Sequence, residues 1–294
     1  MSVLLLARAI KLTAIPVLLA SLLSGCSGLA TLNAALLAQD YPVTADIAYG
    51  PDPRHRLDVH RPAGDALHPV VVFFYGGGWK NGARGDYKFV AEALVKRGYV
   101  VVIPDYRVYP AVRFPVFIED GAKAVRWVHE NIRQHGGDPE RLYLGGHSAG
   151  AHLGAMLALD RHYLQAEGLE TTDIKGFFGL AGPYALDPTE YRSTRDIFAT
   201  AKTRAETQPV EFVTDKAPPM LLLHGTGDGT VYPVNSQKLA AALRAHDVPV
   251  RHVEYPDTGH ISILLAFYPA LAGALPVIED VTSALRDFEA GTLR

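Results

Sequence analysis

The sequence has few of the features that mark metalloproteins, disulfide-bonded proteins or nucleic-acid-binding proteins. Its 294 residues include one cysteine, and its 12 histidines form no H-E-x-x-H motif, so neither a metal nor another cofactor is expected. A net charge of -3 provides no basic surface for nucleic acid. No internal repeat or low-complexity tract is evident. The composition, 48% hydrophobic and 20% charged, is typical of a soluble globular enzyme.

The single cysteine, Cys26, ends an N-terminal segment with the pattern of an export signal. A short N-terminal stretch carries Arg8 and Lys11. An apolar run over 12–23 follows it and is too short to span a bilayer comfortably. The stretch ends in Leu-Leu-Ser-Gly-Cys, which resembles the lipobox of bacterial lipoproteins. This resemblance implies cleavage before Cys26 and acylation of that residue, which would hold the protein on a membrane surface. An ordinary signal peptide or an uncleaved anchor is the alternative.

The same segment sets the expected domain organisation and location. Residues 1–25 would be the signal peptide, 26–43 the lipidated N-terminus and tether, and 44–294 one folded domain without a dividing linker. Ser27 follows the cysteine in place of Asp, which is similar to the pattern of lipoproteins delivered to an outer membrane. We therefore expect an exported protein, lipid-anchored to a bacterial membrane, with its folded domain in the periplasm or at the cell surface.

Apolar strands alternate with helical patterns along the expected domain. Continuous β-branched and aromatic runs such as 70–74 and 100–103 are typical of strands buried on both faces of a sheet. Residues 149–159 are apolar nearly all round, as expected of a helix buried against that sheet. The alternation predicts an α/β fold, a three-layer αβα sandwich with a mostly parallel eight-stranded sheet. The expected strands are 46–49, 57–60, 70–75, 99–104, 141–146, 176–181, 220–224 and 250–255.

One stretch, 183–218, interrupts the alternation. It contains no strong strand and mixes aromatic with charged residues. Because it lies between two expected strands, it would sit over the carboxyl edge of the sheet, where ligands of open α/β sheets bind. We expect this stretch to form a cap or insertion over a site. A surface loop without that role is nearly as well supported.

Residues Gly146-His147-Ser148-Ala149-Gly150 place a serine between two glycines directly after a strand and before a helix. So tight a turn holds the residue at its apex in a strained backbone conformation, with its side chain clear of the sheet. The unpaired N–H groups at the start of the helix then point at anything bonded to the Ser148 oxygen. The pattern predicts a nucleophilic serine.

Other strand ends supply the groups that such a serine needs. Three glycines follow the 70–75 strand, and Gly77, Gly78 and the N–H of Ala149 are the predicted oxyanion hole. A phosphate-binding loop is the alternative, although P-loop spacing is absent. Asp228 follows a buried strand and can orient a histidine, but Gly-Asp-Gly is also a plain turn signal. His260, after the last strand, completes the order Ser…Asp…His.

Three other histidines compete with His260 for the role of general base. His147 is adjacent to the serine, but on a sharp turn it is expected to point away from it. His224 lies at a strand end, where a packed or hydrogen-bonded core histidine is the more common case. His152 lies one turn into the buried helix. His260 is therefore the predicted base.

Together these residues resemble the α/β-hydrolase carboxylesterases over roughly 46–288. The likeness is greatest to groups that pair an H-G-G-G-W loop with G-x-S-A-G, namely the hormone-sensitive-lipase-like, arylformamidase and isoprenylcysteine-methylesterase groups. The segments at 105–107, 114–115 and 136–139 (D-Y-R, F-P and G-G-D-P) also read like motifs of these families. Tyr75 stands where the family usually has His. In that family the residue at this position supports the loop and takes no part in the chemistry. The change to Tyr is therefore expected to alter the loop geometry and not to remove the activity.

The resemblance implies a serine carboxylesterase that acts on small-molecule esters. Asp228 would orient His260, which would deprotonate Ser148 as it attacks the ester carbonyl and forms an acyl-enzyme. Trp79 and Tyr184 are candidates for the substrate pocket, or equally packing residues. Two alternatives stay open: the same triad acting on a formamide, amide or peptide bond, and a catalytically dead, membrane-tethered binding protein on the same fold.

Overall fold

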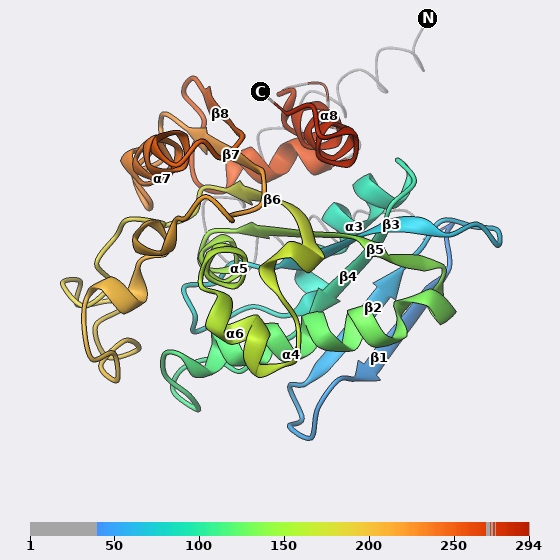
Figure 1. The fold of residues 1–294 in the computed structure, drawn as a ribbon, viewed down its shortest axis with the longest axis horizontal. Coiled ribbons are helices and arrows are strands. Elements are labelled where there is room, and N and C mark those ends of the chain that lie inside the picture. The colour runs from blue at the N-terminus through green and yellow to red at the C-terminus, as the bar shows by residue number, and fades with distance from the viewer. Residues whose placement is uncertain (1–39, 269–270, 272, 274, 294) are drawn as a thin grey trace, which may run out of the picture.

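A twisted sheet of eight strands runs through the protein, whose computed structural model describes residues 40–268, 271, 273 and 275–293 (Figure 1). Its strand order is β1-β2-β4-β3-β5-β6-β7-β8. The β1–β2 and β2–β4 pairs are antiparallel, and every pair from β4 to β8 is parallel. The strands are β1 Val43–Ala48, β2 Arg56–His60, β3 His68–Phe74, β4 Val100–Pro104, β5 Gly137–His147, β6 Ile174–Leu180, β7 Met220–Gly225 and β8 Val250–Tyr255.

The predicted mostly parallel eight-stranded sheet is confirmed, and each expected strand overlaps an observed one. The main difference is β5, which begins at Gly137, four residues before the predicted start. The continuous apolar runs behave as expected, because the side chains of β4 and of the second half of β3 are fully buried. Such strands need cover on both faces of the sheet.

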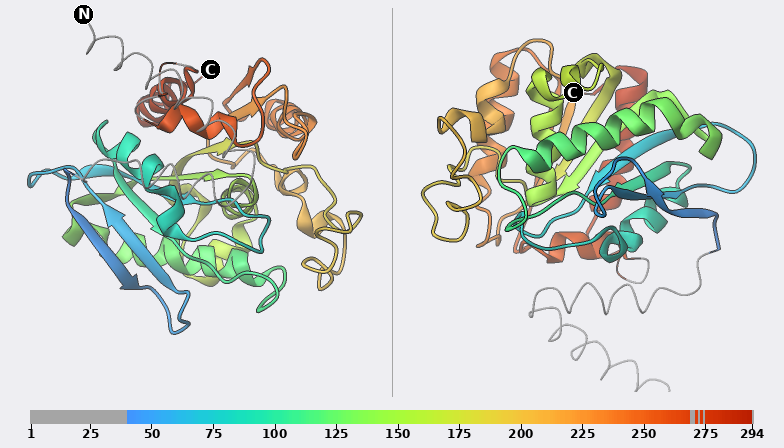
Figure 2. Two further views of the ribbon diagram at one scale, coloured as in Figure 1. Left: turned by 180° about the vertical axis from the view of Figure 1, so that it is seen from behind. Right: turned by 90° about the horizontal axis from the view of Figure 1, so that it is seen from below.

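Two layers of helices provide that cover (Figures 1 and 2). Helices α3 and α8 lie on one face, where both pack against the short 3-10 helix η6, Ser262–Phe267. Helices α4, α5 and α6 pack against one another on the opposite face, and α7 packs on β8. The α-helices are α3 Lys88–Val95, α4 Val116–Asn131, α5 Ala149–Leu159, α6 Arg161–Ala166, α7 Val234–Ala245 and α8 Val277–Ala290. Within the described residues, no helix is long and apolar enough to cross a membrane.

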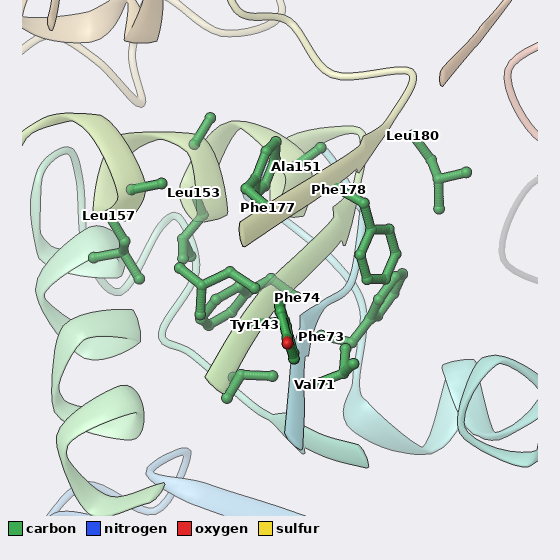
Figure 3. Close-up of a cluster of buried hydrophobic side chains, with 14 of the residues drawn as sticks. Val71, Phe73, Phe74, Tyr143, Ala151, Leu153, Leu157, Phe177, Phe178 and Leu180 are labelled. Atoms are coloured by element: carbon green, nitrogen blue, oxygen red, sulfur yellow. The ribbon is translucent and has the colours of Figure 1, made fainter. Parts of the chain in front are cut away.

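Helix α5 is buried along its whole length against the centre of the sheet. Its side chains Leu153 and Leu157 lie on the same side of the sheet as the rings of Phe74 in β3 and Phe177 in β6 (Figure 3). The helix approaches β3 so closely that a Cβ on Gly150 would lie 2.1 Å from the carbonyl oxygen of Phe74. A larger residue at Gly150 would push α5 off the sheet. This contact fixes the start of α5, and with it the turn after β5, relative to the ends of the strands.

The stretch between β6 and β7 forms no strand within the described residues, as predicted. It contains the short 3-10 helices η4 Ala205–Thr207 and η5 Pro209–Phe212. Phe198 anchors it: this ring is fully buried and packs edge-on against Trp79 at a centroid distance of 4.9 Å. The predicted lipidation site, Cys26, and the predicted signal peptide lie outside the described residues.

Candidate active site

Ser148 occupies the turn between β5 and α5, in the strained conformation that the sequence predicted. Its backbone angles are φ 55° and ψ -122°, a region that L-residues rarely adopt. The turn is possible because Gly146 has no side chain: a Cβ there would lie 2.5 Å from the carbonyl oxygen of Gly150. The N–H of Ser148 donates to the carbonyl of Leu180 at 2.9 Å, which ties the turn to the neighbouring strand.

The structure brings the three predicted side chains together in one line of hydrogen bonds. The Oγ of Ser148 lies 2.8 Å from Nε2 of His260, and Nδ1 of His260 lies 2.7 Å from Oδ2 of Asp228. An ionised carboxylate can only accept, so Nδ1 carries the ring proton and Nε2 is free to accept from the serine hydroxyl. The geometry is that of a serine activated by a histidine and a carboxylate.

Asp228 is held as a buried anion by groups around its carboxylate. The backbone N–H groups of Thr230 and Val231 donate to Oδ1, both at 2.9 Å. The Nε2 atom of His224 lies 3.3 Å from Oδ2. Burial acts to raise the pKa of Asp228, but the hydrogen bonds from His224 and His260 outweigh it and hold that pKa well below its ordinary value. The residue therefore stays ionised at neutral pH and can accept the hydrogen bond from Nδ1 of His260.

His224 is a partner of the site that sequence reasoning placed only in the core. Its ring is fully buried at the end of β7, where Nδ1 contacts Oγ of Ser236 at 2.7 Å and Nε2 contacts the carbonyl of Val231 at 2.8 Å. The expectation of a hydrogen-bonded core residue is thus met, and the contact with Asp228 is additional. The spacing of four residues between His224 and Asp228, across a strand end, is a signal that could have indicated this contact.

The glycine loop after β3 presents backbone N–H groups beside the serine. Gly77 has φ 139°, and a Cβ on it would lie 2.1 Å from the carbonyl oxygen of Asn81, so the turn requires glycine. Among the described residues, the N–H groups of Gly77, Gly78 and Ala149 donate no hydrogen bond. Unpaired N–H groups next to a nucleophile are what an oxyanion hole needs.

Tyr75, at the position usually held by histidine, lies fully buried beneath this loop. Its hydroxyl donates to Oδ1 of Asp105 at 3.0 Å and accepts from Nη2 of Arg54 at 2.7 Å. Its own carbonyl accepts from the Tyr106 hydroxyl at 2.8 Å. These contacts agree with a supporting role for position 75 and leave its side chain away from the serine.

A cavity of about 310 Å³ opens above Ser148. The glycine loop and the turn between β5 and α5 form one side of the cavity. The stretch after β6 and the loop after β7 form the other side. Trp79 lines this cavity, as predicted. Tyr184 does not: its ring points into the core, where it is fully buried and packs edge-on against Phe177. The remaining lining residues are Lys80, Asn81, Pro183, Leu186, Tyr191, Ser193, Thr194, Thr230, Val231 and Tyr232.

The stretch 183–218 therefore does more than cross the surface, because several of its residues line the cavity. Pro183, the residue before Tyr184, lines the cavity in place of Tyr184. No cluster of His, Cys, Asp and Glu with the arrangement of a metal site occurs in the part of the chain that the structure describes.

Similarity to known proteins agrees with this geometry. The isoprenylcysteine alpha-carbonyl methylesterase of Arabidopsis thaliana is 32% identical over 265 residues, which cover 83% of this chain and 62% of that protein. Esterase LipQ of Mycobacterium tuberculosis is 32% identical over 250 residues, covering 76% of this chain and 58% of the relative. The chain thus spans about six-tenths of the length of these curated relatives.

Solved structures share the fold at lower sequence identity. Esterase B from Lactobacillus rhamnosis has 21% identity and a TM-score of 0.77, with 96% of both chains covered. The apo form of Thermogutta terrifontis esterase 2 has 22% identity and a TM-score of 0.70, covering 88% of this chain and 98% of that one. These neighbours confirm the predicted α/β-hydrolase fold. Residues 57–243, a range that includes Ser148 and Asp228, match the family model BD-FAE, and the chain therefore belongs to the BD-FAE family of α/β-hydrolases.

Proposed function

We propose that this protein is a serine carboxylesterase that hydrolyses small-molecule esters. The observation that carries the proposal is the line of short hydrogen bonds from Asp228 through His260 to Ser148. Beside Ser148 lie three backbone N–H groups that donate no hydrogen bond among the described residues. The names of the relatives, an isoprenylcysteine methylesterase and an esterase, support an ester as the bond that is cut in preference to an amide.

The reaction begins with attack of the Ser148 oxygen on the carbonyl carbon of the ester. His260 takes the serine proton, and Asp228 stabilises the imidazolium that results. The electron pair of the C=O bond moves onto the carbonyl oxygen, where the N–H groups of Gly77, Gly78 and Ala149 stabilise it. Each such hydrogen bond contributes about 3 kcal/mol in the transition state.

Collapse of this intermediate breaks the bond to the alcohol, which leaves with the proton from His260. The products of this half are a free alcohol and an acyl group on Ser148. A water molecule then gives its proton to His260 and attacks the acyl carbon by the same route. The second collapse releases the carboxylic acid and returns the proton to Ser148.

The first test measures hydrolysis of p-nitrophenyl acetate and butyrate by the purified domain. Ser148→Ala and His260→Ala are expected to lower kcat by at least about 10⁴-fold, with unchanged circular dichroism. His246→Ala is the matched control, because His246 is exposed at the C-terminal end of α7 and does not line the cavity above Ser148. Turnover by either triad variant at the rate of the unmodified protein would contradict the proposal.

We also propose that the domain is exported and held on a membrane by lipid on Cys26. The support is the resemblance of residues 22–26 to a lipobox. Metabolic labelling with a radioactive fatty acid in a bacterial host tests it. The full chain is expected to incorporate label and to fractionate with membranes, and Cys26→Ser is expected to do neither. Equal labelling of the two proteins would contradict lipidation at this residue.

A further inference from the structure

His147 is next to Ser148 in sequence, yet its ring takes part in a second set of contacts apart from the triad. Its Nε2 atom lies 3.0 Å from the backbone carbonyl of His260, and its Nδ1 atom lies 3.0 Å from the hydroxyl of Tyr87. That hydroxyl accepts a hydrogen bond from the N–H of Gly76 at 3.1 Å. The ring is buried at 1% exposure and does not line the cavity above Ser148.

The direction of each hydrogen bond in this set follows from the chemistry of its two ends. The carbonyl of His260 can only accept, so Nε2 of His147 carries the proton. The N–H of Gly76 can only donate, so the oxygen of Tyr87 accepts there. The Tyr87 hydroxyl can donate to Nδ1 of His147 when that nitrogen carries no proton. With the ring neutral, both nitrogens of His147 are satisfied in this set, because Nε2 donates and Nδ1 accepts. Burial, and then the charge of nearby His260, lower the pKa of His147 to about 3.

The network joins three segments that are far apart in the sequence. Gly76 precedes Gly77 in the oxyanion loop, His147 precedes the nucleophile, and His260 is the base. The fit is close as well: the rings of His147 and His260 are 4.9 Å apart, and a Cβ on Gly76 would lie 2.7 Å from Nδ1 of His147. A shift of His147 therefore displaces the base, the oxyanion loop or both.

We propose that His147 and Tyr87 are positioning residues that fix the base and the oxyanion loop relative to the nucleophile. His147 acts by donating to the main chain of His260, and Tyr87 by joining His147 to Gly76. Neither residue exchanges a proton with substrate. A displacement of about 1 Å in a reacting group costs about 100-fold in rate, so a small loosening of this network lowers kcat. The inference rests on the proposed esterase activity.

The experiment compares four variants by steady-state hydrolysis of p-nitrophenyl butyrate. His147→Leu removes both hydrogen bonds of the ring, and His147→Gln keeps a side-chain N–H that reaches toward the carbonyl of His260. Tyr87→Phe removes the hydroxyl that joins His147 to Gly76. Tyr143→Phe is the matched control: Tyr143 lies buried on β5, the strand that carries His147, five residues before Ser148, and stacks on Phe288 of α8. Active sites are titrated with a fluorophosphonate, so that each kcat refers to folded, reactive protein.

We expect His147→Leu and Tyr87→Phe to lower kcat by about 10- to 100-fold with KM within about twofold of the unmodified value. His147→Gln is expected to recover a substantial part of the loss, and Tyr143→Phe to stay near the unmodified kcat. A kcat per titrated site for His147→Leu within twofold of the unmodified protein would overturn the inference. A His147→Gln variant no better than His147→Leu would also overturn it, because the donor to His260 would then have no effect.

Failure of the inference is distinguishable from failure of the proposed function. An unmodified protein that hydrolyses no ester and takes up no fluorophosphonate contradicts the proposed function. An active unmodified protein whose Ser148→Ala variant is inactive, and whose His147→Leu and Tyr87→Phe variants are fully active, leaves the esterase in place and contradicts the positioning role alone.

Discussion

The two sides of the cavity above Ser148 are held in different ways. One side, here called the catalytic wall, consists of the glycine loop at 76–79 and the turn at 146–150. It is fixed by the close contact of Gly150 with β3, by the hydrogen bond from Ser148 to Leu180 of β6, and by the hydrogen bond from Gly76 to the Tyr87 hydroxyl. The other side, the outer wall, consists of the lining residues of 183–194 together with 230–232. Its two tyrosines, Tyr191 and Tyr232, are 45% and 60% exposed.

This difference separates chemistry from substrate choice. On the catalytic wall, glycines stand where a side chain would strike the main chain, so few substitutions leave the geometry intact. On the outer wall, exposed side chains project from loops, so substitutions there change the shape of the cavity at small cost to folding. We expect changes in the catalytic wall to act on kcat and changes in the outer wall to act on KM and selectivity.

The largest effect is expected from Asp228→Asn, which changes the group that orients the base. The amide cannot hold the proton of His260 on Nδ1 in the same way, so the base is presented in the wrong tautomer. A loss on the order of 10⁴-fold in kcat is expected, measured on p-nitrophenyl butyrate. Asp247→Asn, in the exposed loop after α7, is the control and should keep full activity. An active Asp228→Asn protein would remove this residue from the catalytic machinery.

Gly77→Ala tests whether the catalytic wall depends on close backbone contact. The added Cβ would lie 2.1 Å from the Asn81 oxygen, so the loop must move and the N–H of residue 77 turns away from the developing oxyanion. A loss of about 100- to 1000-fold in kcat is expected. At Gly78, where φ is 61°, an added Cβ would have no other atom within 4 Å. Gly78→Ala is therefore expected to lose less kcat than Gly77→Ala. Equal losses in the two variants would contradict the importance of the Gly77 contact.

Acid is expected to destabilise the protein through buried histidines beside the catalytic wall. Burial lowers the pKa of His152 to about 4, against a slightly opposing hydrogen bond to Thr207. A histidine with a lowered folded-state pKa contributes full stability above its unfolded pKa of about 6.5, and that stability is lost as the pH falls toward 4. For His152 the loss reaches about 2 kcal/mol at pH 5.

The measurement is urea unfolding of the unmodified protein and of His152→Gln at pH 7 and pH 5. Because the glutamine does not titrate, the stability difference between the two proteins should shift in favour of the variant by about 2 kcal/mol on going from pH 7 to pH 5. A difference that does not change with pH would mean that His152 is protonated equally in the folded and unfolded chains.

The smallest effects are expected from Tyr191→Ala and Tyr232→Ala on the outer wall. Each substitution removes an aromatic ring whose contact with an apolar ester contributes about 1 kcal/mol to binding. The expected result is a rise in KM of roughly fivefold. The kcat for p-nitrophenyl acetate is expected to stay within about twofold. Leu67→Ala, an exposed apolar residue outside the cavity, is the control. A large fall in kcat in either tyrosine variant would mean that the two walls are not separate.

The same division explains which parts of the site could be predicted from sequence. Ser148, Asp228 and His260 each follow a strand, and parallel strands end at one edge of the sheet, so local patterns were enough to bring them together. The glycines carry a signal as well, because their spacing around a strand end is rare without a steric reason. The three-layer fold with a mostly parallel sheet followed from the alternation of strands with helices.

Other features depend on contacts between distant parts of the chain and left no local pattern. Tyr184 was predicted as a pocket candidate, but its ring is fully buried and lies against Gly182, where a side chain would leave no room for it. His147 was expected only to point away from the serine, since its partners Tyr87 and His260 come from other elements. The cavity-lining residues of 183–194 belong to an irregular stretch, where no periodicity tells which side chains face inward.

The most direct measurement is the reaction of the unmodified protein with a fluorophosphonate, followed by mass spectrometry of the intact chain and its peptides. An activated serine beside an oxyanion hole should take up one phosphonyl group per chain, located on Ser148, and His260→Ala should react at least about 100-fold more slowly. Label on another residue, or equal rates of labelling in the two proteins, would contradict the assignment of Ser148 and His260 as nucleophile and base.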